Sequence, residues 1–138
     1  MISIRLAETD DDVSQAYAIR FDVFVDEQKV PKELELDEHD AGARHYLLFD
    51  DSKCIGTARL VNGYKVGRFA ILKAFRRQGY GFKLLSYIIN DARNLGCKCL
   101  ELNAQLTSIR FYNSLGFKEE GEIFDDAGID HKLMKLFL

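Results

Sequence analysis

The stretch Phe69-Ala70-Ile71-Leu72-Lys73-Ala74-Phe75-Arg76-Arg77-Gln78-Gly79-Tyr80-Gly81-Phe82-Lys83-Leu84-Leu85 decides how the rest of the chain is organised. Its beginning continues an alternating pattern, which predicts a strand with Val66, Arg68 and Ala70 on one face and Phe69 and Ile71 on the other. Its end opens a run of apolar residues at helical spacing, namely Leu84, Leu85, Ile88, Ile89, Ala92 and Leu95. The stretch therefore predicts a strand, a basic turn that contains glycines, and a helix.

The turn between this strand and this helix is suited to binding a phosphate or a pyrophosphate. A strand that turns directly into a helix N-terminus leaves backbone N–H groups without partners, and the helix dipole adds positive potential there. Gly79 and Gly81 let the backbone approach an anion closely. Arg76 and Arg77 can add charge-assisted hydrogen bonds. The alternative interpretation is a loop with two solvated arginines and no ligand.

Two common classes of nucleotide site fit this turn poorly. A dinucleotide fold requires a small residue three positions after the last glycine, and Leu84 stands there. A nucleoside-triphosphate loop requires Gly-Lys-Ser or Gly-Lys-Thr at the helix start, whereas Gly81 is followed by Phe82 and Lys83. The turn therefore predicts a different phosphate-containing ligand.

The pattern Arg76-x-x-Gly79-x-Gly81, preceded by the strand Phe69-Ala70-Ile71, resembles the acyl-CoA signature of the GNAT N-acyltransferase superfamily. A second segment, Ser108-Ile109-Arg110-Phe111-Tyr112-Asn113-Ser114-Leu115-Gly116-Phe117, is similar to that family's Phe-Tyr-x-x-Leu-Gly-Phe segment. Residues 23–28 and 35–37 further resemble the small bacterial YjcF/ElaA-like branch. The two motifs occur in the family's order, with one helix and one strand between them.

The resemblance implies acetyl-CoA as co-substrate, held by the turn through its pyrophosphate and by the preceding strand through its pantetheine arm and acyl carbonyl. The cofactor-binding residues that it implies are Phe69, Ala70, Ile71, Arg76, Arg77, Gln78, Gly79, Tyr80, Gly81, Phe82 and Ser108. This sequence departs from the family where many members have proline and glycine, with Lys73 and Arg77 respectively. Neither departure removes a backbone amide, although Arg77 could change how the pyrophosphate is gripped.

Acyl transfer from a thioester to an amine requires a neutral amine, a stabilised oxyanion and a proton for the leaving sulfur. Tyr112 is the candidate acid, although a thiol pKa of about 8.5 makes the help of an acid modest. The alternative is that Tyr112 is a boundary residue whose hydroxyl is hydrated. For the oxyanion, the resemblance implies a backbone N–H near Phe69 to Ile71, where the central strand diverges from its parallel neighbour.

The general base is left open by the sequence, because a relayed water could also serve. The candidate side chains are Glu27, Glu35, Asp37, His39, Asp40, His45, Glu101 and His131. Of these, Glu27, Asp37 and His131 are predicted on the acceptor side, since the acidic loop and the last hairpin should flank the thioester end. An acidic rim would also attract a cationic amine.

Composition sets outer bounds on function. The 138 residues suit one acyl-CoA N-acyltransferase domain spanning 1–138, and the net charge of −3 disfavours a nucleic-acid partner. No apolar run approaches the roughly 20 residues of a membrane helix, and the N-terminus resembles no targeting peptide. Cys54, Cys97 and Cys99 fit no zinc spacing, so no metal is expected. A cytoplasmic bacterial protein is the expectation, and a homodimer is compatible with it.

The expected fold class is α/β (α+β), a single-domain GNAT-like mixed and mostly antiparallel sheet of six to seven strands with helices on both faces. Strands are predicted from Ile2 to Leu6 and at 44–50, 53–61, 64–71, 98–104, 117–124 and 130–137, and helices at 11–25, 78–95 and from Thr107 or Ser108 to Gly116. Residues 26–40 are expected to form a short helix or an ordered loop. Thr9 is expected to cap the first helix, Thr107 or Ser108 to cap the last one, and Asn62-Gly63 to form a hairpin turn.

Three functions of different classes follow from these observations. The first is an N-acetyltransferase that moves an acetyl group from acetyl-CoA to a primary amine, on a small molecule or a peptide, by direct attack in a ternary complex. Cys97 and Cys99 lie away from both motifs, which argues against a covalent cysteine intermediate. The second is a non-catalytic acyl-CoA sensor, and the third is a structural domain that binds no nucleotide.

Overall fold

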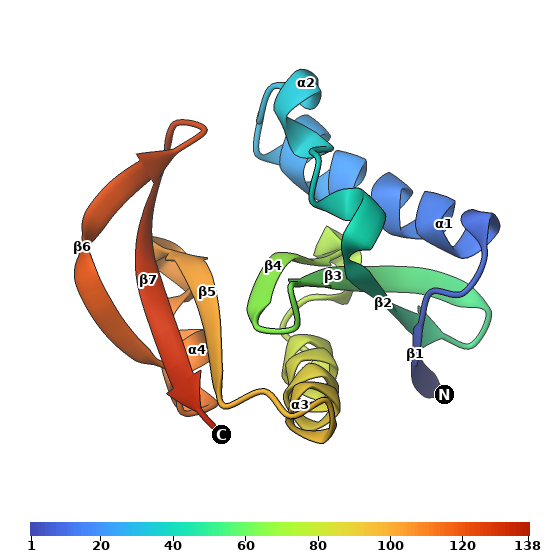
Figure 1. Cartoon of the computed structure of the whole chain (residues 1–138). Helices are drawn as coiled ribbons and strands as arrows, with labels where there is room; N and C mark the ends of the chain where they lie inside the picture. Colours follow the sequence, from blue (N-terminus) through green and yellow to red (C-terminus); the bar gives the residue numbers. More distant parts are fainter.

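The chain is organised around one seven-stranded sheet, with the strand order β1-β2-β3-β4-β5-β7-β6 in a computed structural model that describes residues 1–138 (Figure 1). All neighbouring strands are antiparallel except β4 and β5, which are parallel. The strands are β1 (Ile2–Leu6), β2 (Arg44–Asp50), β3 (Lys53–Val61), β4 (Lys65–Ile71), β5 (Cys99–Gln105), β6 (Lys118–Asp126) and β7 (Ile129–Phe137). This confirms the predicted mixed, mostly antiparallel sheet.

Helices pack on both faces of this sheet, as predicted, with α1 and α3 on opposite sides of β2 to β4 in Figure 1. The α-helices are α1 (Asp10–Arg20), α2 (Lys32–Glu35), α3 (Tyr80–Asn94) and α4 (Ile109–Ser114), and the other helical segments are η1 (Phe21–Glu27), η2 (Asp40–Gly42), η3 (Lys73–Phe75) and η4 (Leu106–Ser108). The α3 face of the sheet holds a core of 17 buried residues, among them Tyr46, Leu48, Leu84 and Ile88. Smaller clusters, which include Leu47 and Phe49, lie under α1. None of the helices combines the length and the apolar character that crossing a bilayer requires.

The first helix begins as predicted but continues differently. Thr9 accepts a hydrogen bond from the backbone N–H of Asp12, whose side chain bonds back to the cap, so the two residues form a capping box. The predicted helix over 11–25 is helical throughout, but at Phe21 the α-helix passes into the π-helix η1, which runs to Glu27. Ile19 of α1 and Val23 of η1 are buried together with Ala70 of β4.

Strand β4 contains a bulge that overturns the predicted alternation. Arg68 and Phe69 together oppose one residue of β3, because Thr57 pairs with Ala70 but Arg59 pairs with Gly67. Arg68 adopts a left-handed conformation, with φ of +49°. The extra residue reverses which side the following residues face. Val66 therefore lies in the large core together with Phe69, while Ala70 packs under α1.

Most ends of the remaining elements lie where turn and cap residues in the sequence predict them, with exceptions at α4 and β6. Asn62 and Gly63 have φ of +56° and +78°, as the predicted hairpin turn requires. Helix α3 ends in a Schellman motif, in which Gly96 has φ of +87° and the N–H of Cys97 donates to the carbonyl of Ala92. At α4 the cap prediction is wrong, because Ser108 precedes the helix without making a side-chain hydrogen bond to it. Residues 125 and 126 belong to β6 rather than to the last turn.

Candidate functional site

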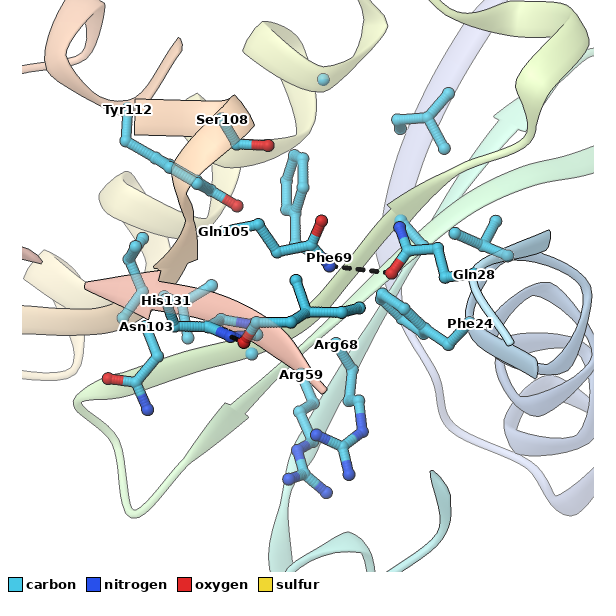
Figure 2. A pocket seen from close by; sticks show the side chains of 18 of the residues that line it. Phe24, Gln28, Arg59, Arg68, Phe69, Asn103, Gln105, Ser108, Tyr112 and His131 are labelled. Carbon is cyan, nitrogen blue, oxygen red and sulfur yellow. Dashed lines mark hydrogen bonds between the residues drawn. The ribbon is translucent and has the colours of Figure 1, made fainter. Parts of the chain in front are cut away.

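A cleft of about 1150 Å³ opens where β4 and β5 separate (Figure 2). The two strands pair only through Lys65 with Glu101 and Val66 with Leu102. Beyond these pairs the strands diverge, and the space between them is lined by η1, β4, the turn before α3, the end of β5, α4 and the last hairpin. The cleft thus joins segments from most of the chain.

The edge of β4 presents main-chain groups to this cleft. The N–H of Leu72 donates to the carbonyl of Ile55 on β3, at 2.9 Å. Because successive residues of a strand point their N–H and C=O groups to opposite sides, those of Ile71 and Phe69 point away from β3 and toward the gap. The Ile71 carbonyl indeed accepts a hydrogen bond of 2.8 Å from Nε of Arg76, outside the sheet.

The turn before α3 keeps a row of free donors. No backbone hydrogen bond has an N–H of residues 77–82 as its donor, and no side chain caps the helix. Gly79 has φ of +83°, a conformation that favours glycine, and a Cβ there would meet no atom within 4 Å. Free N–H groups at the N-terminus of a 15-residue helix are suited to an anion.

Arg76 and Glu27 form an ion pair that the sequence did not predict. The Nη1 and Nη2 atoms of Arg76 donate to the two carboxylate oxygens of Glu27, at 2.6 and 2.7 Å. The hydrogen bonds from Arg76 lower the pKa of Glu27, which keeps this carboxylate charged. With the bond to Ile71, Arg76 joins η1, β4 and the turn, so a bond from Arg76 to a phosphate would require these contacts to open.

The other predicted cofactor-binding residues line the cleft, with one exception. Phe69, Ala70, Ile71, Arg77, Gly79, Tyr80, Gly81, Phe82 and Ser108 all contribute to its wall. Gln78 does not, because its side chain turns back and Nε2 donates to the carbonyl of Ala74 at 3.4 Å. Only the backbone of Gln78 is therefore placed to contact a ligand of the turn.

Tyr112 lies on α4 and is 8% exposed. Its ring packs edge-on against Phe69, Phe111 and Phe117, with centroids 5.2 to 6.2 Å away. Figure 2 shows the hydroxyl pointing into the same space as the hydroxyl of Ser108. Burial raises the pKa of Tyr112, so the phenol stays protonated and can donate a proton.

Residues 34–40 are held by a largely buried network of three arginines and three carboxylates. Arg20 is 1% exposed and donates to Glu35 at 2.9 Å and to Asp40 at 2.7 Å. Arg59 donates to Asp40 at 2.8 Å and to both oxygens of Asp37, at 2.7 and 3.0 Å. The bonds from Arg59 lower the pKa of Asp37. Burial alone would raise the pKa of Asp40, but the bonds that it accepts, from Arg20 above all, hold that pKa low.

Arg68 completes this network from the bulge of β4. Its guanidinium donates to the main-chain carbonyl of Glu35, at 3.0 Å, and approaches the carboxylates of Glu35 and Asp37, at 3.0 and 3.4 Å. Residues 34–37, which are the end of α2 and the two residues after it (the 34–37 loop), are thereby attached to the strand that carries Phe69. Asp37 lines the cleft, but both of its oxygens are already engaged by arginines.

His131 lies at the start of β7 and faces the cleft. It is 9% exposed, and its ring stacks on Phe124 at a centroid distance of 5.9 Å. Nδ1 lies 2.7 Å from the carbonyl of Ile129. Glu101 and His45, two other candidate bases, do not line the cleft: Glu101 pairs with Lys135, and His45 bonds through Nε2 to the carbonyl of Asp40.

A pair of amides that sequence reasoning missed crosses the cleft. Nε2 of Gln105, the last residue of β5, donates to Oε1 of Gln28, which follows η1, at 2.8 Å. Figure 2 shows this bond near Phe69, with Phe24 also pointing toward it. Gln28 falls within the segment 23–28 that carries the family resemblance, but no pattern in the sequence signals a contact between residues 77 positions apart.

Comparison with known proteins identifies the family. The family model described as "Acetyltransferase (GNAT) domain" matches residues 7–138. An uncharacterized N-acetyltransferase of Bacillus subtilis, YjcF, is 34% identical over 133 residues, which cover 94% of this chain and 95% of YjcF. Escherichia coli ElaA is 29% identical over 130 residues, covering 86% and 85%, and its crystal structure superposes with a TM-score of 0.87.

The fold agrees with this assignment. The crystal structure of an acyl-CoA N-acyltransferase from Pseudomonas aeruginosa superposes with a TM-score of 0.85 at 25% identity, covering 98% of this chain and 97% of that one. The resemblance inferred from the two motifs, including the YjcF/ElaA-like branch, is therefore confirmed. The chain belongs to the GNAT family and is an acetyltransferase.

Proposed function

We propose that residues 1–138 act as one catalytic domain that transfers an acetyl group from acetyl-CoA to a primary amine, by direct attack in a ternary complex. The observation that carries this proposal is the row of unpaired N–H groups at residues 77–82, at one end of the cleft that Tyr112 lines. These donors and the helix dipole suit the pyrophosphate of a CoA thioester. The Pseudomonas aeruginosa relative is named an acyl-CoA N-acyltransferase, which supports the same class of donor here.

The proposed binding mode follows the wall of the cleft. The turn donors hold the pyrophosphate, and Arg77, whose side chain is not committed to another residue, adds a positive charge. The outward N–H groups of Phe69 and Ile71 bind the pantetheine arm and polarise the thioester carbonyl. Tyr112 donates a proton to the leaving sulfur. The cleft wall contains no cysteine, which favours direct attack by the amine over a covalent thioester on the enzyme.

The amine is proposed to enter from the side of η1, the 34–37 loop and the last hairpin. Glu27, Asp37 and His131 all line the cleft, with Glu27 beside Arg76 of the turn. The two carboxylates stay charged because arginines hold them, so their role is to shape the entrance rather than to accept protons. A small-molecule or peptide amine fits an opening of this kind.

The test measures thermal unfolding of the full chain with acetyl-CoA and with S-acetylpantetheine, which lacks the pyrophosphate. Acetyl-CoA at 100 times its Kd should stabilise the fold by about 2.7 kcal/mol, and S-acetylpantetheine much less. Release of free thiol is then followed with a panel of primary amines. An unchanged melting temperature with acetyl-CoA would refute the site, whereas stabilisation without turnover of any amine would favour the non-catalytic sensor.

A further inference from the structure

Strand β5 separates two candidate proton-transfer groups. Its residues Leu102 and Ala104 lie in the large core together with Tyr112. On the opposite face, Gln105 pairs directly with His131 in the β5–β7 ladder. Because directly paired residues point to the same face of a sheet, His131 and Tyr112 lie on opposite faces of β5. Both nevertheless line the cleft, since β5 is free of β4 at this end.

The imidazole of His131 is held in one orientation and one tautomer. A carbonyl oxygen can only accept, so the contact of 2.7 Å to Ile129 places the proton of the neutral ring on Nδ1. The stacking contact with Phe124 fixes the plane of the ring. Nε2 then carries the free lone pair, and no residue of the protein hydrogen-bonds to it.

The other acidic and histidine side chains near the amine entrance are engaged or exposed. Glu27 is paired with Arg76, and Asp37 with Arg59. Glu35 and Asp40 are buried and form ion pairs with Arg20. His39 is about half exposed beside Glu38, and Asp126 is exposed at the hairpin tip. His131 therefore combines access to the cleft, a fixed orientation and an uncommitted basic atom.

We propose that His131 is the general base of the reaction, an inference that rests on the proposed function above. Nε2 accepts the proton that an alkylammonium must lose before it can attack. The nitrogen lone pair then forms the C–N bond, and the C–S bond breaks with its electron pair passing to sulfur. Sulfur takes a proton from Tyr112, and Tyr112 regains one from the acylated nitrogen through water. His131 returns its proton to solvent.

The position of the two groups suits this sequence of steps. The amine approaches from the face of β5 that carries His131, and the thiol departs on the face that carries Tyr112. The two direct proton transfers, from the ammonium to His131 and from Tyr112 to sulfur, then each occur on the side where the reacting atom lies, and only the proton that returns to Tyr112 passes between the two sides through water.

The test compares two acceptors of equal size that differ in charge at neutral pH. Methylamine is protonated and needs a base before it attacks, whereas hydroxylamine is uncharged. In His131→Asn the amide N–H can still donate to the Ile129 carbonyl, but the basic Nε2 is gone. This variant should lose about 10²- to 10⁴-fold in kcat/KM with methylamine and less than about tenfold with hydroxylamine. Asp130→Asn, beside His131 on β7 with an exposed side chain that does not line the cleft, serves as the matched control and should change neither rate.

The outcomes test the role of His131 separately from the proposed acetyl transfer. An equal loss with both acceptors, or no loss with either, would overturn the role of His131 as a base. The stabilisation by acetyl-CoA should be the same in the variant and in the wild type, which shows that the site is folded. If the His131→Asn substitution unfolds the chain, His131→Gln replaces it. A wild-type enzyme that acetylates neither probe nor any amine of the panel would overturn the proposed function itself, and the role of His131 with it.

Discussion

Replacing Tyr112 by phenylalanine separates the chemistry of its hydroxyl from the packing of its ring. The hydroxyl has no hydrogen-bond partner in the protein, while the ring contacts Phe69, Phe111 and Phe117. Tyr112→Phe should therefore change the free energy of unfolding by no more than about 0.5 kcal/mol. Turnover should fall by about 100-fold, the lower end of the range for a general acid, because a thiolate is already a fair leaving group.

Tyr46→Phe is the matched control at a tyrosine remote from the cleft. Tyr46 is fully buried, and its hydroxyl donates to Asp91, which also binds Arg44. Removing this hydroxyl deletes a hydrogen bond to a charged group and should lower the free energy of unfolding by about 1.5–3 kcal/mol. The rate of acetyl transfer, measured well below the melting temperature, should not change.

The two variants therefore predict opposite patterns. Urea denaturation reports the free energy of unfolding, and release of free thiol under saturating acetyl-CoA reports turnover. The role of Tyr112 as an acid would be refuted if Tyr112→Phe lowered turnover less than about threefold, which is well below the contribution of a general acid. A loss of stability comparable to that of Tyr46→Phe would instead show that the Tyr112 hydroxyl has a structural partner.

Further substitutions test the turn, the buried network and the Glu27 contact. Gly79→Ala forces a Cβ into a left-handed conformation and should lower the free energy of unfolding, measured by urea denaturation, by about 1–2 kcal/mol. Gly81 lies in the helix, where a Cβ would make ordinary contacts only, so Gly81→Ala should leave the free energy of unfolding unchanged or raise it by up to about 1 kcal/mol. Arg20→Met strips two buried carboxylates of their main partner and should cost about 3–5 kcal/mol. The pKa of Asp40 is lowered in the folded state, so the stability that its ionised form contributes is complete above about pH 4 and is lost as the pH falls toward the folded pKa. Asp40→Asn should therefore make the melting temperature, measured at a series of pH values below about 4, fall less steeply with pH. Glu27→Gln breaks a partly exposed pair worth at most about 1 kcal/mol, so the Kd for acetyl-CoA should change by no more than about fivefold. A 100-fold fall in turnover at unchanged Kd would make Glu27 the base instead.

Most strands and helices could be predicted because their signals are local. Residues 44–50 and 53–61 form strands as predicted, and the Asn62-Gly63 turn needs only two residues to be recognised. The bulge at Arg68 could not be found in this way, because arginine has no preference for a left-handed conformation. Its cause lies elsewhere in the chain, in the carbonyls and carboxylates of residues 34–37 that bind the guanidinium.

In the candidate site, too, local features could be predicted from the sequence and contacts between distant residues could not. The phosphate turn is contiguous in sequence, so its glycines and the start of α3 could be read together. The partners of the acidic residues could not, because Glu27 meets Arg76 across 49 positions and Asp37 meets Arg59 across 22. Their place in the acidic segment predicted acceptor-side residues at both positions. Only the pairing shows that these carboxylates are already neutralised, which leaves His131 as the basic group with a free lone pair.

The bulge also connects the proposed acceptor side of this cleft mechanically with the proposed thioester side. Arg68 bonds to the 34–37 loop through its side chain, and its backbone starts the segment from which Phe69 and Ile71 present their N–H groups. A non-glycine residue in a left-handed conformation costs roughly 1–2 kcal/mol, which the bonds of Arg68 to the loop offset. A displacement of the loop by an incoming amine would therefore act directly on the strand that is proposed to polarise the thioester. Arg68→Gly would relax the backbone but remove this connection, so it should raise the KM for the amine and lower kcat while the stabilisation by acetyl-CoA is retained.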